Sequence, residues 1–350
     1  MNLNDNKFIN PNEYNGALNI DAVDPQILLE MLRKMILIRK AEEKIAENIE
    51  NGKIKCPCHL AVGQEAIGVA VGLAMRNSDR AFGAHRSHSH YLALNEDTYS
   101  LFAEVLGKFS GCSHGMGGSM HIIDKENGFL GSVPIVGATI PIATGAGLAA
   151  KFDKRGDIAI SYFGDGACEE GVLHESLNMA SIMKLPVLFV CENNLFSSHL
   201  HINLRQPSNS TARFADAHKV ENMVIDGNDV VDMYKKLLKI ISEMRVESKP
   251  FFMEAFTYRW RGHVGHREDI DVGVQRKDDL SQWKKRDPIK RLLNSLIDAK
   301  IITKMDFENL SQQIQDKINN DWNTAENSDY PDQEFLLQTV YSNYICNKKK

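Results

Sequence analysis

One carboxylate and one amide follow two apolar segments of the chain, in a pattern that suits a magnesium ion. Asp165 lies between two glycines after the apolar residues 157–163, and Asn193-Asn194 follows a second apolar run, residues 186–191. Such runs indicate buried strands that stop at tight turns. Mg²⁺ prefers oxygen ligands from one or two protein groups plus phosphate oxygens, which matches one Asp, one Asn and a backbone carbonyl. The glycines allow the backbone to approach a diphosphate closely.

The segment between the two runs predicts the helix that positions them. Apolar residues recur at helical spacing across residues 169–184, so this helix is expected to pack against a sheet. A strand, a helix and a strand of this length form a right-handed parallel crossover, and neighbouring parallel strands lie about 4.8 Å apart. Asp165 and Asn194 are therefore expected to converge on one ion at the carboxyl ends of adjacent strands, where open α/β sheets bind ligands.

A third strand is predicted at residues 251–258, another apolar run, which follows a helix with apolar residues at helical spacing across 230–244. His263 comes after the end of this strand. A histidine there can donate a hydrogen bond to a diphosphate oxygen and to a developing alkoxide, whereas the alternative is a solvated, pH-sensitive side chain.

The whole span from residue 164 to residue 194 carries more information than its parts, because Gly-Asp-Gly and Asn-Asn alone are ordinary turn sequences. It closely resembles the thiamine diphosphate motif of 2-oxo acid dehydrogenases, and in particular the alpha subunit of their decarboxylating component. That group contains the pyruvate, branched-chain 2-oxo acid and acetoin dehydrogenases. The matching residues are Gly164-Asp165-Gly166-Ala167, Glu170-Gly171, Glu175, Asn178, Ala180, Leu185-Pro186 and Glu192-Asn193-Asn194.

Further matches occur in the family's order, from about residue 28 to residue 341. They are His59-Leu60 with Gly63-Gln64-Glu65-Ala66, His85-Arg86-Ser87-His88, the glycine-rich residues 111–121, Ile135-Val136-Gly137-Ala138, and Thr257-Tyr258-Arg259 with Gly262-His263. The resemblance implies a three-layer α/β thiamine diphosphate-binding fold with a mostly parallel central sheet and helical terminal extensions. We expect the diphosphate-binding domain at residues 25–325, between a polar arm (1–24) and a C-terminal tail (326–350).

The resemblance also implies three groups of site residues. The Mg²⁺ ligands are Asp165, Asn194 and the carbonyl of Phe196. The residues that bind the cofactor, through its diphosphate or its pyrimidine, are His85, Arg86, Ile135, Val136, Gly164, Gly166, Ala167 and His263. The catalytic histidines are His263 and His88, of which His88 is expected to shape the loop near the substrate rather than to bind a metal.

Several assignments leave alternatives open. Arg86 suits a diphosphate oxygen, but it could equally form an ion pair with Asp79. Arg259 could pair with loop carboxylates or with phosphate. Residues 115–118 resemble a phosphate loop, yet dense glycines also permit close packing, and no ligand is assigned to them.

The chain also departs from the family pattern. His85 and Phe196 stand where relatives often have tyrosine, and Pro134 stands where they often have glycine. Val264 replaces the serine of regulated mitochondrial relatives, so phosphorylation at that point is not expected. The polar residues 197–213 are less family-like, so the substrate side of the site could differ.

Composition fits a large soluble enzyme subunit. The 350 residues are 43% hydrophobic, enough for a substantial core, and the net charge of -5 argues against a nucleic-acid surface. No apolar segment reaches membrane-spanning length, and the amino terminus has neither signal-peptide nor transit-peptide character, so a cytoplasmic location is expected. The Cys56-Pro57-Cys58 spacing is poor for zinc, and the six cysteines are expected to be free thiols.

The outer elements are predicted from the same patterns. Helices are expected at residues 25–50, 64–76 and 304–320, with another starting at Asp287-Pro288. The charged residues 267–287 are predicted to be a loop, and Tyr330-Pro331-Asp332 is expected to begin a tail that packs on the outside.

The implied chemistry requires a partner. Thiamine catalysis needs a carboxylate at the pyrimidine ring, and the resemblance implies that this glutamate lies in a separate beta subunit, giving an α2β2 heterotetramer with a shared site. The implied reaction is oxidative decarboxylation of a 2-oxo acid, or acetoin cleavage, with acyl transfer to a lipoyl acyltransferase. Two alternatives are a carboligating or non-oxidative enzyme without a lipoyl partner and a noncatalytic structural subunit. The intact pair of Asp165 and Asn194 argues against the second.

Overall fold

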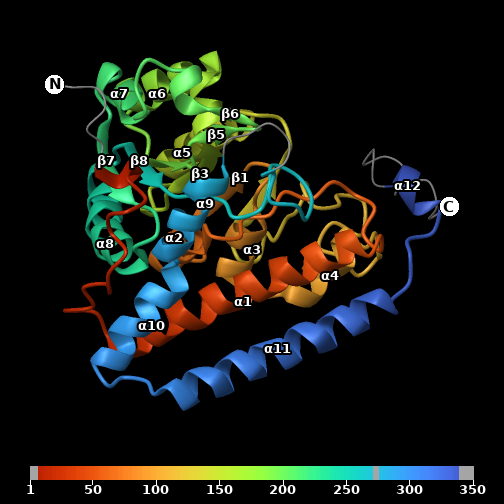
Figure 1. Ribbon diagram of the computed structural model, residues 1–350. Helices are drawn as coiled ribbons and strands as arrows, with labels where there is room; N and C mark the ends of the chain where they lie inside the picture. The colour runs from red at the N-terminus through yellow and green to blue at the C-terminus, as the bar shows by residue number, and fades with distance from the viewer. Residues whose placement is uncertain (1–6, 271–275, 339–350) are drawn as a thin grey trace.

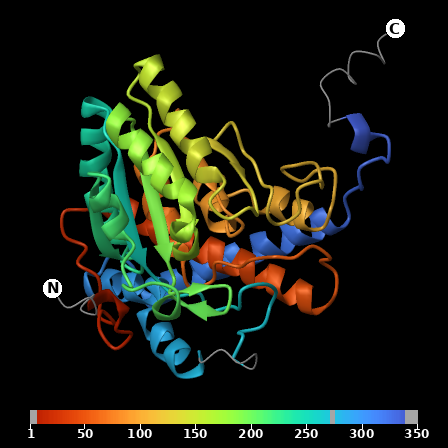
Figure 2. The same cartoon turned by 90° about the horizontal axis from the view of Figure 1, so that it is seen from above.

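The computed structural model describes residues 7–270 and 276–338, which form an α/β fold in three layers (Figures 1 and 2). The central sheet has six strands in the order β2-β1-β3-β4-β8-β7, and every neighbouring pair is parallel. The strands are β1 Arg80–Gly83, β2 Phe129–Ser132, β3 Ala159–Gly164, β4 Val187–Asn193, β7 Glu221–Asp226 and β8 Phe251–Phe256. A separate antiparallel ribbon pairs β5 (Phe196–Ser197) with β6 (Leu200–His201). The predicted α/β fold with a mostly parallel sheet is confirmed.

Helices cover both faces of this sheet, with α5, α6 and α7 on one face and α1, α2 and α8 on the other (Figure 1). The helices are α1 Pro25–Glu50, α2 Glu65–Ala74, α3 His88–Asn95, α4 Thr98–Val105, α5 Thr139–Asp153, α6 Gly171–Met183, α7 Ala212–Ala217, α8 Val230–Glu247, α9 Lys277–Trp283, α10 Pro288–Asp298, α11 Lys304–Glu326 and α12 Phe335–Gln338. The 3₁₀ turns are η1 Lys7–Ile9, η2 Asp165–Glu169, η3 Ile202–Leu204 and η4 Lys284–Arg286.

Successive side chains of each strand point to opposite faces of the sheet and so belong to two different layers of the core. Ile160 and Val190 pack with α1, α2 and α8, whereas Ala159 and Phe189 pack with α5, α6 and α7. Successive side chains of a strand point to opposite faces, so a sheet covered on both sides is apolar throughout. All seven residues of β4 are buried.

The two strands that precede the candidate ligands are neighbours, as predicted. The crossover from β3 through η2 and α6 returns to β4, and Gly164 pairs with Glu192 at their ends. β8 lies on the other side of β4, where Glu192 pairs with Ala255. The carboxyl ends of the three strands are therefore level at one edge of the sheet.

Helix starts follow their capping residues. Asp24 caps α1 by accepting a hydrogen bond from the Gln26 N–H at 2.8 Å, and Asp287 caps α10 through the Ile289 N–H at 3.1 Å. Both helices have proline in the first turn, so the starts predicted at residues 25 and 288 are confirmed. α11 runs beyond the predicted residue 320 because Trp322 and Ala325 are buried as well.

The prediction of a loop at residues 267–287 is wrong in part, because α9 and η4 lie within it. Leu280 and Trp283 are buried, and the Trp283 ring stacks on Tyr258 with centroids 5.3 Å apart. Two apolar side chains on one side of a charged segment are enough to hold a short helix against the core. Residues 271–275 lie outside the described residues.

The terminal segments pack on the outside of the sheet layers. α11 runs beside α1 (Figure 1), and Leu18 of the N-terminal arm exchanges backbone hydrogen bonds with Ser295 Oγ of α10. The chain after α11 packs on the loop that follows α4, with the Phe335 ring 5.0 Å from that of Phe109. None of the described helices is long and apolar enough to cross a membrane.

A charged contact ties α1 to the end of α3. The Glu96 carboxylate accepts hydrogen bonds from Arg33 at 2.6 Å and lies 2.8 Å from the Lys34 ammonium. Burial alone raises the pKa of Glu96, but the hydrogen bonds from Arg33 and Lys34 outweigh it and lower the pKa to about 2. The ionised carboxylate therefore stabilises the folded state.

We expect Glu96→Gln to lower the free energy of unfolding at neutral pH by about 1–2 kcal/mol. Since the folded-state pKa of Glu96 lies below its ordinary value of 4.5, this difference is present above pH 4.5 and shrinks as the pH falls toward 2. Denaturant titrations at several pH values measure it. Glu47→Gln is the control, because its pair with Lys44 is exposed and contributes little. Equal effects of the two substitutions at pH 7 would contradict the prediction.

Candidate active site

A partly open cavity of about 180 Å³ lies at the carboxyl ends of β3, β4 and β8. Most of the candidate ligands and cofactor contacts reach it. Those that line it are His85, Arg86, Val136, Gly164, Asp165, Gly166, Ala167, Asn194, Phe196 and His263. The fold therefore brings together segments that are up to 178 residues apart in the sequence, as the parallel strand ends predict.

Asp165 supplies the buried carboxylate of the cavity. It begins η2 directly after β3, and only 1% of the residue is exposed. Its carboxylate is paired with Arg205, which also pairs with Glu169. Burial raises the pKa of Asp165, and the neighbouring guanidinium opposes this shift. A buried carboxylate that already attracts a cation is suited to a metal ion.

Asn193 and Asn194 have different partners. Asn193 donates to Glu254 at 2.7 Å and fixes the turn, with Leu195 in the left-handed region at φ 70. Asn194 lines the cavity, where its Oδ1 accepts the Phe196 N–H at 3.2 Å and its Nδ2 donates to Gln64 at 3.3 Å. An amide oxygen has two lone pairs, so Oδ1 retains one for a cation.

Arg86 lies within the cavity wall and links two other segments. Its guanidinium donates to the Leu60 carbonyl and, at 3.2 Å, to the His263 carbonyl. Burial lowers its pKa to about 10, while Glu42 and Glu192 oppose that shift. The alternative pairing with Asp79 does not occur, because Asp79 holds Arg245 at 2.6 Å. A guanidinium has five N–H donors, so several remain for an anion.

Arg259 adds a second buried cation beside Arg86. It donates to the Ser198 carbonyl, and its Nε is buried without a hydrogen-bond partner. Burial first, and then the charges of Arg86 and Arg276, lower its pKa. Within residues 7–270 and 276–338 it makes no ion pair within 4 Å, but the loop carboxylate of Asp269 is near enough to oppose the lowering of its pKa, so both alternatives for Arg259 stay open.

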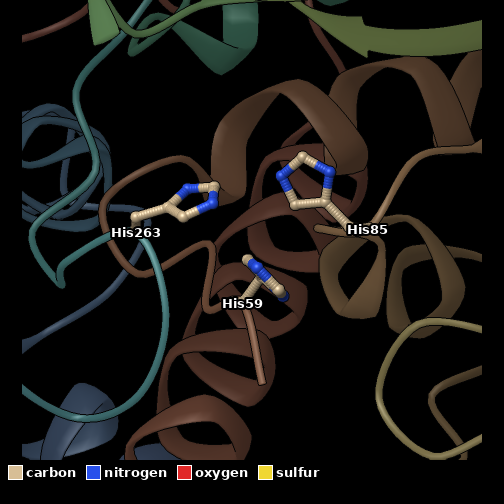
Figure 3. A group of neighbouring side chains, drawn as sticks. All are labelled: His59, His85 and His263. Atoms are coloured by element: carbon tan, nitrogen blue, oxygen red, sulfur yellow. The ribbon is translucent and has the colours of Figure 1, made fainter. Parts of the chain in front are cut away.

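Three imidazole rings lie close together, those of His59, His85 and His263 (Figure 3), and the last two line the cavity. Burial is the main cause that lowers their pKa values, to about 2, 3 and 4 respectively, and the Arg86 charge adds to it. All three rings are therefore neutral at pH 7. A neutral imidazole can donate one hydrogen bond and accept another.

Two candidate residues lie away from the cavity. Ile135 is 67% exposed and is not part of the described lining, although Val136 is. His88 is fully buried at the start of α3, where Nε2 contacts Ser119 Oγ at 2.9 Å and Nδ1 lies 3.4 Å from Glu42. This placement suits the loop-shaping role, whereas a direct contact of His88 with reacting atoms has no support in the geometry.

The glycine-rich loop is held by a carboxylate of the chain itself. Glu104 of α4 accepts backbone N–H groups from four residues at 2.7–3.0 Å: Ser113, Gly115, Gly117 and Gly118. A side chain at Gly117 would lie 2.1 Å from the His121 carbonyl. The glycines therefore serve close packing, and their N–H groups are not available to a phosphate.

Sequence reasoning assigned no role to several cavity residues. The buried His90 ring stacks on Tyr162 with centroids 3.8 Å apart and contacts Glu192 at 3.0 Å. Arg205 lies in the segment that looked least family-like, 40 positions from Asp165. Glu192 belongs to a recognised motif and His90 comes two residues after another, so a signal was available for both, whereas Arg205 had none.

The cysteines play no part in this cavity. The five that the structure describes are free thiols, with Cys56 Sγ 3.8 Å from Cys58 Sγ and Cys168 Sγ 3.6 Å from Cys191 Sγ. Cys346 lies outside the described residues. None of the five cysteines that the structure describes lines the cavity.

Comparison with known proteins gives a consistent match. The family described as "Dehydrogenase E1 component" matches residues 33–334. The pyruvate dehydrogenase E1 component subunit alpha of Rickettsia felis is 31% identical over 313 residues, which cover 89% of this chain and 95% of that protein. The alpha subunit of the acetoin:2,6-dichlorophenolindophenol oxidoreductase of Bacillus subtilis is 32% identical over 90% of this chain and 94% of its own length. The mitochondrial pyruvate dehydrogenase E1 component subunit alpha-1 of Oryza sativa subsp. japonica is 33% identical, over 91% and 80% respectively.

The pair of Arg205 and Asp165 predicts competition with a divalent cation. In metal-free buffer Arg205→Met is expected to lower the free energy of unfolding by about 1–3 kcal/mol, because it leaves a buried carboxylate without its partner. Added Mg²⁺ should then stabilise the variant more than the parent chain, because the ion no longer displaces a guanidinium. Thermal unfolding with and without Mg²⁺ measures both effects.

Arg155→Met is the matched control. The Arg155 side chain is 60% exposed and pairs with Asp153 and Asp157 at 3.2 and 3.0 Å, so its loss should change little. Equal stabilisation of the parent chain and of Arg205→Met by Mg²⁺ would show that Arg205 and the ion do not compete.

Proposed function

The chain belongs to the dehydrogenase E1 component family as an alpha subunit, an oxidoreductase, and we propose that it binds thiamine diphosphate and Mg²⁺ and acts on a 2-oxo acid or on acetoin. One observation carries this proposal. Asp165 and Asn194, at the ends of adjacent strands, line the same cavity as Arg86 and His263. The acyl group is passed to a lipoyl group of an acyltransferase partner.

The donor set fits a magnesium diphosphate. Asp165, the Asn194 amide oxygen and the Phe196 carbonyl are hard oxygen ligands, the kind that Mg²⁺ accepts beside phosphate oxygens. Next to them, Gln64 accepts the Asn194 amide N–H at 3.3 Å and keeps a buried Nε2 that has no partner within the described chain. An anion that accepts its hydrogen bond would remove the cost of burying it.

The residues of this chain bind and orient the cofactor. Arg86 and the imidazoles of His85 and His263 donate to the diphosphate, and the backbone of Gly164, Gly166 and Ala167 allows it to approach. A side chain at Gly166 would lie 2.5 Å from Ser197 Oγ, so this position has no room for one. Val136, which lines the cavity, would flank the pyrimidine, and Ile135, exposed outside the cavity, could do so only where the pyrimidine extends toward the partner. When bound, thiamine diphosphate supplies the electron sink for cleavage of the bond next to the carbonyl.

His263 also takes part in the chemistry. Its ring is neutral because burial and Arg86 lower its pKa to about 4. The neutral ring has one N–H, which it can turn from the diphosphate to an alkoxide as negative charge develops on the substrate oxygen. His88 acts through Ser119 by positioning the loop.

A beta subunit completes the site. The cavity of about 180 Å³ suits a diphosphate and its ion, whereas pockets for whole ligands of this kind usually have 300–1,000 Å³. The missing wall, including a carboxylate at the pyrimidine, must come from another chain, which gives an α2β2 heterotetramer.

The face formed by α5 and α6 is where we place that partner. The two helices contact each other and begin beside the cavity, α5 after Val136-Gly137 and α6 after η2. Phe152 is 72% exposed and Ile182 is 78% exposed on this face, together with Ile142, Met179 and Met183. Several large apolar side chains exposed on neighbouring helices mark a protein interface.

Asp165→Asn tests the proposed function. With the beta subunit co-expressed, the variant should bind thiamine diphosphate with Mg²⁺ about 100-fold more weakly or worse, because the ion loses its charged ligand. Calorimetry measures the binding, and carbon dioxide release from a panel of 2-oxo acids, with acetoin cleavage in parallel, identifies the substrate. Asp157→Asn, at the opposite end of the same strand, is the control and should bind normally. Wild-type affinity in Asp165→Asn would refute the metal assignment.

Ile182→Asp tests the proposed interface. A carboxylate at the centre of an apolar contact should raise the dissociation constant for the beta subunit by at least about tenfold. Val246→Asp is the control, since Val246 is 84% exposed on α8, on the opposite face of the sheet. Analytical ultracentrifugation of the two variants mixed with the beta subunit distinguishes them. If both variants bind alike, the partner lies elsewhere.

A further inference from the structure

Two pairs of cysteine sulfurs lie close together in the part of the chain that the structure describes. Cys168 Sγ of η2 lies 3.6 Å from Cys191 Sγ of β4, and both residues are fully buried in the core. Cys56 Sγ lies 3.8 Å from Cys58 Sγ, in the segment between α1 and α2. Because the two distances are similar, access to solvent is what distinguishes the pairs.

Cys56 lies in the wall of a second, partly open cavity, which shares no lining residue with the one at the strand ends. This cavity of about 590 Å³ lies between the glycine-rich loop and the segment that carries Cys56. A side chain at Gly118 would lie 3.5 Å from Cys56 Sγ, so the glycine leaves the sulfur uncovered on this side. Cys58 is only 1% exposed and does not line the cavity. One sulfur of the pair is therefore open to a small molecule, and the other is protected.

We propose that Cys56 and Cys58 are a thiol pair that a hydroperoxide oxidises to an internal disulfide. Cys56 is the nucleophile that reacts with the peroxide, and Cys58 is the thiol that then closes the bridge. The inference concerns a modification site outside the cofactor cavity and does not depend on the proposed function.

The two sulfurs suit different roles because they share one proton. The hydrogen bond from Cys58, helped by the backbone N–H of Ser119, lowers the pKa of Cys56 to about 6, although burial opposes the shift. The contact with Cys56, together with burial, raises the pKa of Cys58. When it is protonated, Cys56 donates instead to the Val105 carbonyl at 3.5 Å, which is a weak contact because a thiol is a weak donor. At pH 7 Cys56 is therefore mainly a thiolate, the nucleophilic form of cysteine, and Cys58 is a thiol.

The oxidation consumes one hydroperoxide. The Cys56 thiolate attacks a peroxide oxygen, the S–O bond forms, the O–O bond breaks, and the departing oxygen takes up a proton from solvent. The sulfenic acid that results is then attacked by Cys58, which forms the S–S bond and breaks the S–O bond. The departing hydroxide combines with the Cys58 proton as water. Two electrons pass from the sulfurs to the peroxide, and a dithiol reductant reverses the change.

The bridge needs only a small movement of the chain. A disulfide has an S–S bond of about 2.05 Å and Cα atoms about 4.4–6.8 Å apart. Cα atoms two residues apart are separated by at most about 7 Å, so the Cys-Pro-Cys spacing keeps the backbones within or near that range. The sulfurs must approach by about 1.8 Å from their separation of 3.8 Å. Rotation of two short side chains between staggered conformations supplies a movement of this size.

Mass spectrometry of the full chain tests the proposal. After treatment with hydrogen peroxide, unfolding and alkylation, trypsin should release the peptide 56–76, which contains Cys56, Cys58 and no other cysteine. We expect this peptide to carry no alkyl group and to be lighter by two hydrogens than its reduced, unalkylated form. Treatment with a dithiol before alkylation should restore both alkylation sites. The peptides that contain Cys168 and Cys191 are the internal control, and both should stay alkylated because their sulfurs are equally close but fully buried.

Single substitutions separate the two roles. Cys58→Ser should halt the reaction at the Cys56 sulfenic acid, which dimedone traps. Cys56→Ser should slow the oxidation of the remaining thiol by at least about tenfold, because that thiol is protonated at pH 7. Cys112→Ser is the matched control and should form the bridge like the parent chain. Circular dichroism shows whether each variant is folded, and the measurement on the parent chain stands without them.

Several results would overturn the proposal. One is a peptide 56–76 that is still alkylated at both cysteines under conditions that oxidise free glutathione completely. Another is oxidation of Cys56→Ser at the rate of the parent chain. Oxidation of Cys168 and Cys191 to the same extent would also overturn it, because access would then not distinguish the two pairs.

Discussion

The hydrogen bonds of Arg86 are the contact on which the site depends. The guanidinium lies in the core of the cavity wall and ties the segments before α2 and after β8 to its own. These segments carry His59, His85 and His263. Without the hydrogen bonds of Arg86, the three histidines would lie on loops that nothing else named here joins. A planar group with several donors can satisfy two carbonyls and still present N–H groups to a ligand, which an ammonium group would do less well.

The parallel sheet supplies the second constraint. Because β3, β4 and β8 are adjacent and end level with one another, whatever follows them meets at one edge. Burial then gives the side chains their character: Asp165 acquires a raised pKa, while the imidazoles are neutral. Nitrogen donors and carboxylate or amide oxygens thus lie side by side, the arrangement that the proposed metal-bound diphosphate requires.

Much of this arrangement was predictable from the sequence. The strands at 157–163, 186–191 and 251–258 were evident because buried parallel strands are apolar along their whole length. β1 and β7 were not, since Arg80–Gly83 is too short to form a pattern and Glu221–Asp226 carries charges at both ends. The helix α9 was missed because its two apolar anchors stand among charged residues. In the site, Arg205 and the meeting of His59 with the other two histidines were beyond reach, as only the tertiary fold brings such distant positions together.

The internal ligand of the glycine-rich loop has an evolutionary consequence. Since Glu104 occupies the backbone N–H groups of that loop, the loop reaches its final shape when the chain folds, without waiting for any small molecule. Selection on the residues proposed to contact the cofactor and selection on the glycine-rich loop can therefore proceed independently. Substitutions in the loop are constrained by the carboxylate of Glu104, so we expect them to follow the fit to Glu104 rather than the identity of the substrate.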